Sequence, residues 1–275
     1  MSNDPLILVT GGTGTLGRQV VARLRDAGHP TRVLSRHSHP SEDGVEHVVG
    51  DVSVGFGIES AVQGAYIVVH CAGGRKGDDQ ATANLVRAAA RAKVRHLVYI
   101  SVVGADRIPM TGGVDRAMFG YFGMKLAAER VVTGSGLPWS TLRATQFHDL
   151  LLTIAQQAVR LPVIPIPSGM SFQPIDTGEV AERLVDLALD GPAGLVPDVA
   201  GPRIASVADL LRAYLQARGE ERRLATVWIP GNAARALRAG ANLAPDRAVG
   251  RITWEDFLAE RVSPAADEAG REVAA

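Results

Sequence analysis

Cysteine is nearly absent from this chain of 275 residues, which contains a single one, Cys71. One thiol excludes an internal disulfide and any metal site built on several cysteines. The first residues, MSNDPLILVT, have no basic leader segment, and no apolar run approaches the roughly 18 residues that a membrane-spanning helix needs. We therefore expect a cytoplasmic protein with no membrane partner.

Excess charge of either sign is also missing. Lysine and arginine together number 29, and so do aspartate and glutamate. A chain without excess positive charge lacks the electrostatic attraction on which nucleic-acid binding depends. Hydrophobic residues make up 46% of the chain, which is enough for a sizeable core. We expect a globular protein that acts on a small molecule and binds no nucleic acid, and the sequence leaves a homodimer open.

Lysine is rare as well. Only Lys76, Lys93 and Lys125 occur, and the other 26 basic residues are arginine. The bias is typical of GC-rich coding. A lysine that falls inside a motif is therefore less expected by chance than an arginine would be.

Short apolar runs alternate with segments of helical period through the first half of the chain. The strand-like runs are residues 6–10, 31–35, 46–49, 66–71, 96–102 and 139–142, and the helical segments are 16–27, 58–62, 80–92, 116–132 and 149–160. Strands that are apolar throughout belong to a parallel sheet covered on both faces. The pattern predicts a doubly wound α/β fold.

The second half of the chain has a different character. Residues 161–174 contain four prolines, which exclude a helix and predict an extended, loop-like lip. Helices are expected over 176–189, beginning near Asp176, and over 206–218, 232–239 and 253–261, with Thr253 as N-cap, and a strand near 194–199. We divide the chain into a dinucleotide-binding domain (1–160), a small, mostly helical C-terminal substrate part interleaved with it (161–262) and a flexible tail (263–275).

Three glycines, Gly11, Gly14 and Gly17, follow the first strand and precede a helix. The first permits a tight turn, the second lets backbone amides approach a pyrophosphate, and the third lets helix and strand pack closely. Such a turn can be purely structural, but its place in the first strand–turn–helix unit favours a dinucleotide site at the helix N-terminus. The residues expected to contact the cofactor are Gly11, Thr13, Gly14, Thr15, Leu16, Gly17, Arg18, Ser35, Arg36, Asp51, Val52, Ala72, Gly73 and Lys125.

The end of the second strand indicates which cofactor binds. An acid that would hold the 2′-hydroxyl of NAD is missing there, and Ser35 and Arg36 follow instead. Arg36, with Arg18 as a second candidate, can bind a 2′-phosphate, and Ser35 can donate to it, so we expect NADPH to be preferred over NADH. The alternative is that both arginines are solvated surface residues. Asp51 fits an adenine contact and a turn equally well.

A tyrosine and a lysine four residues apart, Tyr121 and Lys125, lie in a predicted helix, and Ser101 ends the preceding strand. With four tyrosines and three lysines, chance gives this spacing a probability of only about 0.04. Residues four apart share a helix face, and one ammonium can lower the pKa of a tyrosine by the ~3 units needed for acid–base work near neutral pH. The competing interpretation is that Tyr121 is a core aromatic, because the start of this helix is apolar.

The glycine turn, Ser101 and the Tyr121/Lys125 pair together resemble the short-chain dehydrogenase/reductase superfamily. The run YFGMKLAAERVVTGSGLPWSTLRATQFHD is similar to its atypical, NmrA-like branch. The resemblance as a whole covers about residues 5–260 and is specific over the first 150. The resemblance implies a Rossmann-type sheet, a Lys125 that also holds the nicotinamide ribose, and a Ser101 that positions a substrate carbonyl. The branch includes NADPH-dependent reductases, quinone-oxidoreductase-like proteins and cofactor-sensing regulators.

The substrate is expected beyond the carboxyl ends of the strands. Met110, Phe147 and His148 would line a mainly apolar pocket there, although His148 fits a helix start better than a catalytic role. The glycine-rich residues 104–116 could close as a lid, and Arg143 could bind an anionic group or pair with an acid. We therefore expect an NADP(H)-dependent oxidoreductase for a small hydrophobic carbonyl, enone or quinone. The alternatives are a non-catalytic NADP(H) sensor and, with less support, a nucleotide-sugar epimerase.

Overall fold

A central parallel sheet organises the protein, whose computed structural model describes residues 5–40, 43–74 and 77–262. Its seven strands follow the order β3-β2-β1-β4-β5-β6-β9, and every pair in it is parallel. The strands are β1 (Ile7–Thr10), β2 (Thr31–Ser35), β3 (Val45–Val49), β4 (Ile67–His70), β5 (His96–Val102), β6 (Trp139–Ala144) and β9 (Gly194–Leu195). Every residue of β1, β4 and β5 is buried, as expected of strands covered on both faces. The predicted doubly wound α/β fold is confirmed.

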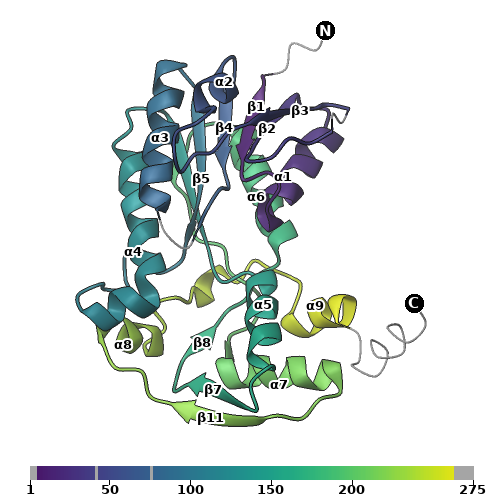
Figure 1. Cartoon of the computed structure of the whole chain (residues 1–275), viewed down its shortest axis with the longest axis vertical. Coiled ribbons are helices and arrows are strands. Elements are labelled where there is room, and N and C mark those ends of the chain that lie inside the picture. Colours follow the sequence, from purple (N-terminus) through teal and green to yellow (C-terminus); the bar gives the residue numbers. More distant parts are fainter. Residues whose placement is uncertain (1–4, 41–42, 75–76, 263–275) are drawn as a thin grey trace.

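Helices cover both faces of this sheet (Figure 1). On one face lie α1 (Thr15–Asp26) and α6 (Thr177–Asp190), and on the other lie α2 (Ile58–Val62), α3 (Asp78–Arg91) and α4 (Gly113–Thr133). One hydrophobic cluster joins Val20 and Leu24 of α1 to Leu184 of α6. The face that carries the glycine turn is therefore completed by a helix from the second half of the chain.

The strand order reverses between β1 and β4, which are neighbours in the sheet although β2 and β3 separate them in sequence. In open α/β sheets such a switch point leaves a crevice at the carboxyl ends of the strands, where ligands bind. The glycine turn after β1, Gly73 after β4 and Ser101 at the end of β5 all lie at this edge.

Beyond the carboxyl ends lies a second layer built mostly of helices (Figure 1). It contains α5 (His148–Ala158), α7 (Val207–Arg218), α8 (Asn232–Arg238), α9 (Trp254–Arg261), a short 3-10 turn (Pro245–Arg247) and the strands β7 (Val163–Pro167), β8 (Ser171–Phe172), β10 (Ala205–Ser206) and β11 (Arg223–Val227). No helix in the described part of the chain is long and apolar enough to cross a membrane.

The expectation of a loop-like lip over 161–174 is wrong, because β7 pairs in parallel with β11 and β8 pairs with β10. Ile164 and Ile166 are buried, while Val163 and Pro165, which alternate with them along the strand, are exposed. This alternation is a strand period, and a two-stranded ribbon tolerates proline where no amide is needed. β11 escaped prediction because four of its five residues are exposed, so it has no apolar pattern.

Helix starts in this second half follow the predicted chemistry. Asp176 accepts hydrogen bonds from the amides of Gly178 and Glu179 at the start of α6. Thr253 accepts from Asp256 N at the start of α9, and the Asp256 carboxylate bonds back to the Thr253 amide. The tail proposed for 263–275 lies outside the described residues.

Candidate functional site

The glycine turn lies between β1 and α1 and packs tightly against the end of β4. Gly11 has a φ of +70°, and a Cβ there would lie 2.6 Å from Ala72 N. A Cβ on Gly17 would overlap the Gly11 carbonyl. Both positions therefore require glycine for close packing of backbone on backbone, as the pattern predicted.

The start of α1 is open. Its N-cap is Gly14, no side chain among the described residues caps it, and its first turn contains no acid. Thr13, Gly14 and Thr15 are exposed. Unpaired amides at a helix N-terminus favour an anion, so the residues present here fit the pyrophosphate of a dinucleotide.

The residues expected around a 2′-phosphate are only partly free to bind one. Ser35 Oγ lies 2.9 Å from His39 Nε2 and accepts from His37 N at 3.3 Å, so local contacts already use this hydroxyl. Arg36 and Arg18 are both exposed, and neither forms an ion pair with the rest of the described chain. The two guanidinium groups, rather than the serine hydroxyl, are therefore available to bind a phosphate.

Asp51 and Val52 follow β3 in a turn. Asp51 Oδ1 accepts from both Ser53 N and Ser53 Oγ, at 2.8 and 2.7 Å, which lowers the pKa of this carboxyl, and Arg36 lowers it further. The Val52 carbonyl accepts from Asn84 Nδ2 at 2.9 Å. Asp51 is therefore a turn-forming residue, and its Oδ2 accepts neither of these two hydrogen bonds.

At the end of β4, His70 belongs to the core. Its Nδ1 lies 2.6 Å from Thr10 Oγ1, its Nε2 lies 3.1 Å from Thr82 Oγ1, and burial lowers the pKa of His70 to about 3. Thr82 in turn donates to the carbonyl of Asp78 at 2.6 Å. Burial also raises the pKa of the neighbouring Cys71 thiol to about 12, so neither residue titrates near neutral pH.

Lys125 is the most constrained charge in this region. It is 4% exposed, and its Nζ lies 3.1 Å from Asp78 Oδ2. The same ammonium donates to Tyr99 Oη and to the Ile100 carbonyl, both at 3.3 Å. Burial opposes its charge, but Tyr99, Tyr121 and Asp78 outweigh burial and raise the pKa of Lys125, which stays protonated.

Asp78 and Tyr99 were not predicted as site residues. Asp78 is the first residue of α3, where an acid is expected merely to favour the helix dipole. In the sequence, Tyr99 looks like one more apolar residue of a buried strand. It precedes Ser101 by two positions and so faces the same side of the sheet, and this shared face could have identified Tyr99 as a site residue.

Tyr121 lies one helical turn before Lys125, with Nζ 5.9 Å from the centre of its ring. The residue is 42% exposed, which excludes the core interpretation. Burial of the phenol raises the pKa of Tyr121, Lys125 lowers it and Asp78 raises it again, so that it stays above its ordinary value. Lys125 lowers the pKa of Tyr121 as expected, but burial outweighs it and Asp78 adds to burial, so the expected net lowering is wrong for this structure.

Ser101 lies at the end of β5, next to the Ile100 carbonyl that accepts from Lys125. It is 4% exposed, and its hydroxyl has no hydrogen-bond partner in the described part of the chain. A buried hydroxyl without a partner is costly unless something binds to it. Ser101, Lys125 and Tyr121 thus gather at one edge of the sheet.

The expected substrate residues separate into two groups. Met110 packs against α4, since a Cβ on Gly123 would lie 2.9 Å from Met110 Cγ, two residues from Tyr121. Phe147 packs on the main sheet core instead. His148 is 0% exposed and begins α5, with its ring 5.0 Å from that of Phe257, so it offers no surface to a substrate.

The segment expected to move as a lid, residues 104–116, is fastened to α8. Gly104 has a φ of +95°, and a Cβ there would lie 2.6 Å from the Ala241 carbonyl. The Asp115 carboxylate accepts from Gly112 N at 2.9 Å and from Ala233 N at 3.0 Å, so one side chain serves the first turns of α4 and α8. These contacts hold the segment in place.

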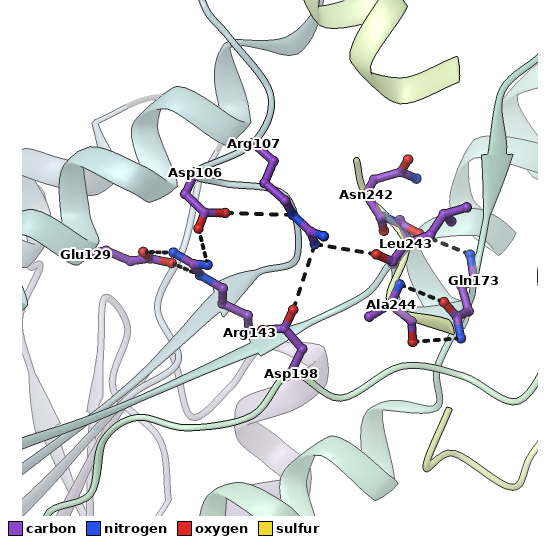
Figure 2. A network of polar contacts seen from close by, with 10 residues as sticks. Asp106, Arg107, Glu129, Arg143, Gln173, Asp198, Asn242, Leu243 and Ala244 are labelled. Carbon is purple, nitrogen blue, oxygen red and sulfur yellow. Dashed lines mark hydrogen bonds and ion pairs between the residues drawn. The ribbon is translucent and has the colours of Figure 1, made fainter. Parts of the chain in front are cut away.

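Arg143 pairs with acids, which was the simpler of its two predicted roles. Its Nε and Nη2 donate to the two oxygens of Glu129, at 2.8 and 2.7 Å, and its Nη1 donates to Asp106 at 2.8 Å (Figure 2). Arg107 continues the network to Asp198, at 3.8 Å. The network joins β6, α4 and the loop after β5, and each of the three guanidinium nitrogens of Arg143 already donates to an acid.

Known proteins resemble this chain in sequence and in fold. A family described as NAD(P)H-binding matches residues 11–190. The isoflavone reductase homolog IRL of Zea mays is 34% identical over 210 residues, covering 70% of this chain and 66% of that one. The (4-alkanoyl-5-oxo-2,5-dihydrofuran-3-yl)methyl phosphate reductase of Streptomyces griseus is 34% identical over 154 residues, covering 54% of this chain and 51% of that one.

The chain spans only part of these relatives, and about 20% of the length of the mycobacterial proteins that it also matches. The solved structure of the Bordetella bronchiseptica enzyme WbmH in complex with NAD+ shares the fold, with a TM-score of 0.69 and 17% identity, over 96% of this chain and 98% of that one. With the family match over most of the sheet and the geometry of the site, the chain belongs to the NAD(P)H-binding, NmrA-like branch of the atypical short-chain dehydrogenases/reductases.

Proposed function

We propose that this protein is an NADP(H)-dependent oxidoreductase for a small hydrophobic carbonyl, enone or quinone. The observation that carries the proposal is the pairing of a buried ammonium, Lys125, with an exposed phenol, Tyr121, beside the unpartnered hydroxyl of Ser101. An ionisable phenol held next to a fixed charge at a ligand-binding edge is typical of acid–base catalysis.

The chain's own residues would hold the cofactor along this edge. The amides of the glycine turn and the start of α1 would bind the pyrophosphate, and Lys125 would contact the nicotinamide ribose. A Cβ on Gly73 would lie 3.5 Å from both Lys125 Nζ and Asp78 Oδ2, so glycine leaves the ion pair uncovered on that side. When bound, NADPH supplies the hydride that reduces the substrate.

Tyr121 would donate the proton that the reduced oxygen needs, and Ser101 would hold that oxygen by a hydrogen bond. Two exposed apolar side chains, Val114 and Met118, lie seven and three residues before Tyr121, which puts them on its side of α4. Apolar neighbours of a catalytic phenol favour a hydrophobic substrate and agree with the uncharged carbonyls and quinones proposed.

Purified protein mixed with NADPH and a panel of quinones, enones and aldehydes tests this function through the loss of NADPH absorbance. Tyr121→Phe should lower kcat by about 10²- to 10⁴-fold, the usual contribution of an acid–base group, while the Kd for NADPH stays within twofold. Tyr66→Phe is the matched control, because Tyr66 is also exposed but lies at the opposite, amino end of the sheet, before β4. Full turnover by Tyr121→Phe would refute the assigned role.

A second candidate is a non-catalytic NADP(H) sensor. It is favoured by the Asp78 carboxylate, which offsets the charge that would activate Tyr121. Tight NADPH binding without turnover on the whole panel would select this function, and turnover of any panel member would exclude it.

A further inference from the structure

Asp78 carries a carboxylate that is almost completely buried, at 5% exposure. Its Oδ1 accepts from Gly74 N at 2.6 Å, and its Oδ2 lies 3.1 Å from Lys125 Nζ. A buried charge is costly unless an opposite charge lies against it, so each group keeps the other ionised. The pair has no net charge and is a fixed part of the site.

The other ionisable groups around this pair come from the end of β4 and from β5, and they are neutral. His70 and Cys71 lie at the end of β4, where burial keeps the imidazole unprotonated and the thiol protonated. Tyr99 of β5 accepts from Lys125, and burial raises the pKa of its phenol to about 12. Among the described residues that face Lys125, Asp78 alone therefore supplies negative charge.

Charge compensation changes what Lys125 does to Tyr121. An isolated ammonium stabilises a neighbouring phenolate and so prepares a base, whereas an ammonium with a carboxylate 3.1 Å away exerts only the weaker field of a dipole. Asp78 accordingly opposes the lowering of the Tyr121 pKa that Lys125 causes. The geometry favours a phenol that keeps its proton at neutral pH.

We propose that Asp78 is a positioning residue that neutralises Lys125 and keeps Tyr121 protonated, so that the site works as a proton donor, in the direction of substrate reduction. The inference rests on the proposed function. In the step concerned, the hydride from NADPH adds to the carbonyl carbon, and the π electrons of the C=O bond move to oxygen. The Tyr121 O–H bond breaks, its proton passes to that oxygen, and the exposed tyrosinate then takes a proton from water.

The test is a titration of Tyr121 in the cofactor-free protein, followed by the ultraviolet difference absorbance of tyrosinate. Asp78→Asn removes the charge but keeps an oxygen that can accept from Gly74 N, and the Tyr121→Phe background identifies the Tyr121 component. We expect the Tyr121 midpoint to shift to lower pH in Asp78→Asn. The matched control is Asp79→Asn, which removes an exposed acid from the same first turn of α3 and should leave the midpoint unchanged.

Activity gives a second readout that a merely structural role would not move. In Asp78→Asn the alkaline limb of the pH profile of kcat for reduction should move to lower pH, so that kcat for reduction falls at alkaline pH while it changes little at neutral pH. If Asp78→Asn does not fold, the double variant Asp78→Asn with Lys125→Met removes both charges at once and should titrate Tyr121 near the wild-type midpoint.

The outcomes separate this inference from the proposed function. An unchanged Tyr121 midpoint in folded Asp78→Asn, or a midpoint that moves in the double variant as far as in the single one, overturns the role of Asp78 even if Tyr121→Phe abolishes turnover. Conversely, failure of the whole substrate panel overturns the proposed function, and full turnover by Tyr121→Phe overturns the role of Tyr121 and the assigned direction. In either case a lowered midpoint in Asp78→Asn would still show that Asp78 protects the phenol from ionisation.

Discussion

The two ends of the proposed site differ in the groups that form them, which are backbone amides at the cofactor end and side chains at the catalytic end. At the cofactor end, the turn from Gly11 to Gly17 offers backbone amides, and its shape depends on the absence of side chains. At the catalytic end, side chains from α3, β5 and α4 converge on one buried ammonium. The first end is determined by local sequence, whereas the second exists only after distant segments have packed together.

The largest expected effect on binding and stability comes from placing a side chain in the glycine turn of the cofactor end. Gly17→Ala puts a Cβ onto the Gly11 carbonyl, which cannot move without distorting the turn. We expect NADPH binding to weaken at least tenfold and the protein to lose about 1–3 kcal/mol of stability, as overpacked sites do. Isothermal calorimetry and thermal unfolding measure the two effects.

Gly120→Ala is the matched control, since Gly120 is also helical and a Cβ there would meet no atom within 4 Å. This change should leave NADPH binding intact and stabilise the protein by up to about 1 kcal/mol. Equal losses in the two variants would show that the turn does not depend on the missing Cβ.

Removing one partner from a buried charge network gives the next effect in size. Glu129→Gln replaces the carboxylate that binds Arg143 through two oxygens by a neutral amide, in a site where both side chains are under 10% exposed. Because Asp106 still pairs with Arg143, the expected cost is about 1.5–3 kcal/mol of unfolding free energy, measured by urea denaturation.

The exposed pair Arg251–Glu182, at 3.6 Å, serves as its comparison. Glu182→Gln should cost no more than about 0.5 kcal/mol, because water screens exposed ion pairs. If both substitutions lower the free energy of unfolding by the same amount, burial is not the reason that the Arg143–Glu129 pair stabilises the protein.

A buried titratable group that burial keeps neutral, His148, extends the contrast to pH. Burial lowers the pKa of His148 to about 4, whereas the unfolded chain has the ordinary value near 6.5. Because the unfolded state binds the proton more tightly, the stability from neutral His148 is complete above pH ~6.5 and is lost as pH falls toward 4. The loss amounts to about 3 kcal/mol.

His148→Phe should remove this part of the acid sensitivity, seen as a shallower fall of unfolding free energy between pH 6.5 and 4. His37→Gln is the control, because His37 is exposed, and it should leave the slope unchanged. A His148→Phe protein with the wild-type slope would show that the imidazole is protonated in the fold.

The smallest effect is expected at the exposed arginine of the cofactor end. Arg36→Ala should weaken NADPH binding about tenfold and leave NADH binding nearly unchanged, as one charge-assisted contact to a 2′-phosphate is worth roughly 1.5–3 kcal/mol before solvent screening. Arg32→Ala is not a suitable control, since Arg32 pairs with Glu46. Arg87→Ala, on α3, serves instead, because Arg87 is exposed and forms no ion pair with the described part of the chain.

The same division explains what could be predicted from sequence. Periodicity and glycine spacing predicted the strands of the sheet, β2 and β5 with their exact bounds, and the turn before α1, because these depend on nearby residues. Lys125 was found through its spacing from Tyr121, yet its partner Asp78 lies 47 positions upstream and is joined to it only by the packing of α3 on α4. The expectation for the Tyr121 pKa was wrong because spacing alone shows neither the burial of the phenol, which raises its pKa most, nor the nearby Asp78 carboxylate.

His148 and the strands β7 and β11 failed for related reasons. A histidine at a helix start reads as polar and accessible, and only the closure of α9 over α5 buries it between aromatic rings. β7 contains prolines, and its pairing partner β11 is mostly exposed, so neither strand could be recognised without the other.

The packing of α6 on α1 has a consequence for how the protein is made. Residues 177–190 supply Val180, Ala181 and Leu184 to the cluster that backs the glycine turn, although more than 150 residues separate them from α1. On the ribosome, the amino-terminal strands and α1 emerge long before this helix is synthesised, and one apolar face of the sheet stays open to water during that interval. The nascent chain must therefore be protected from aggregation until α6 leaves the exit tunnel and closes that face.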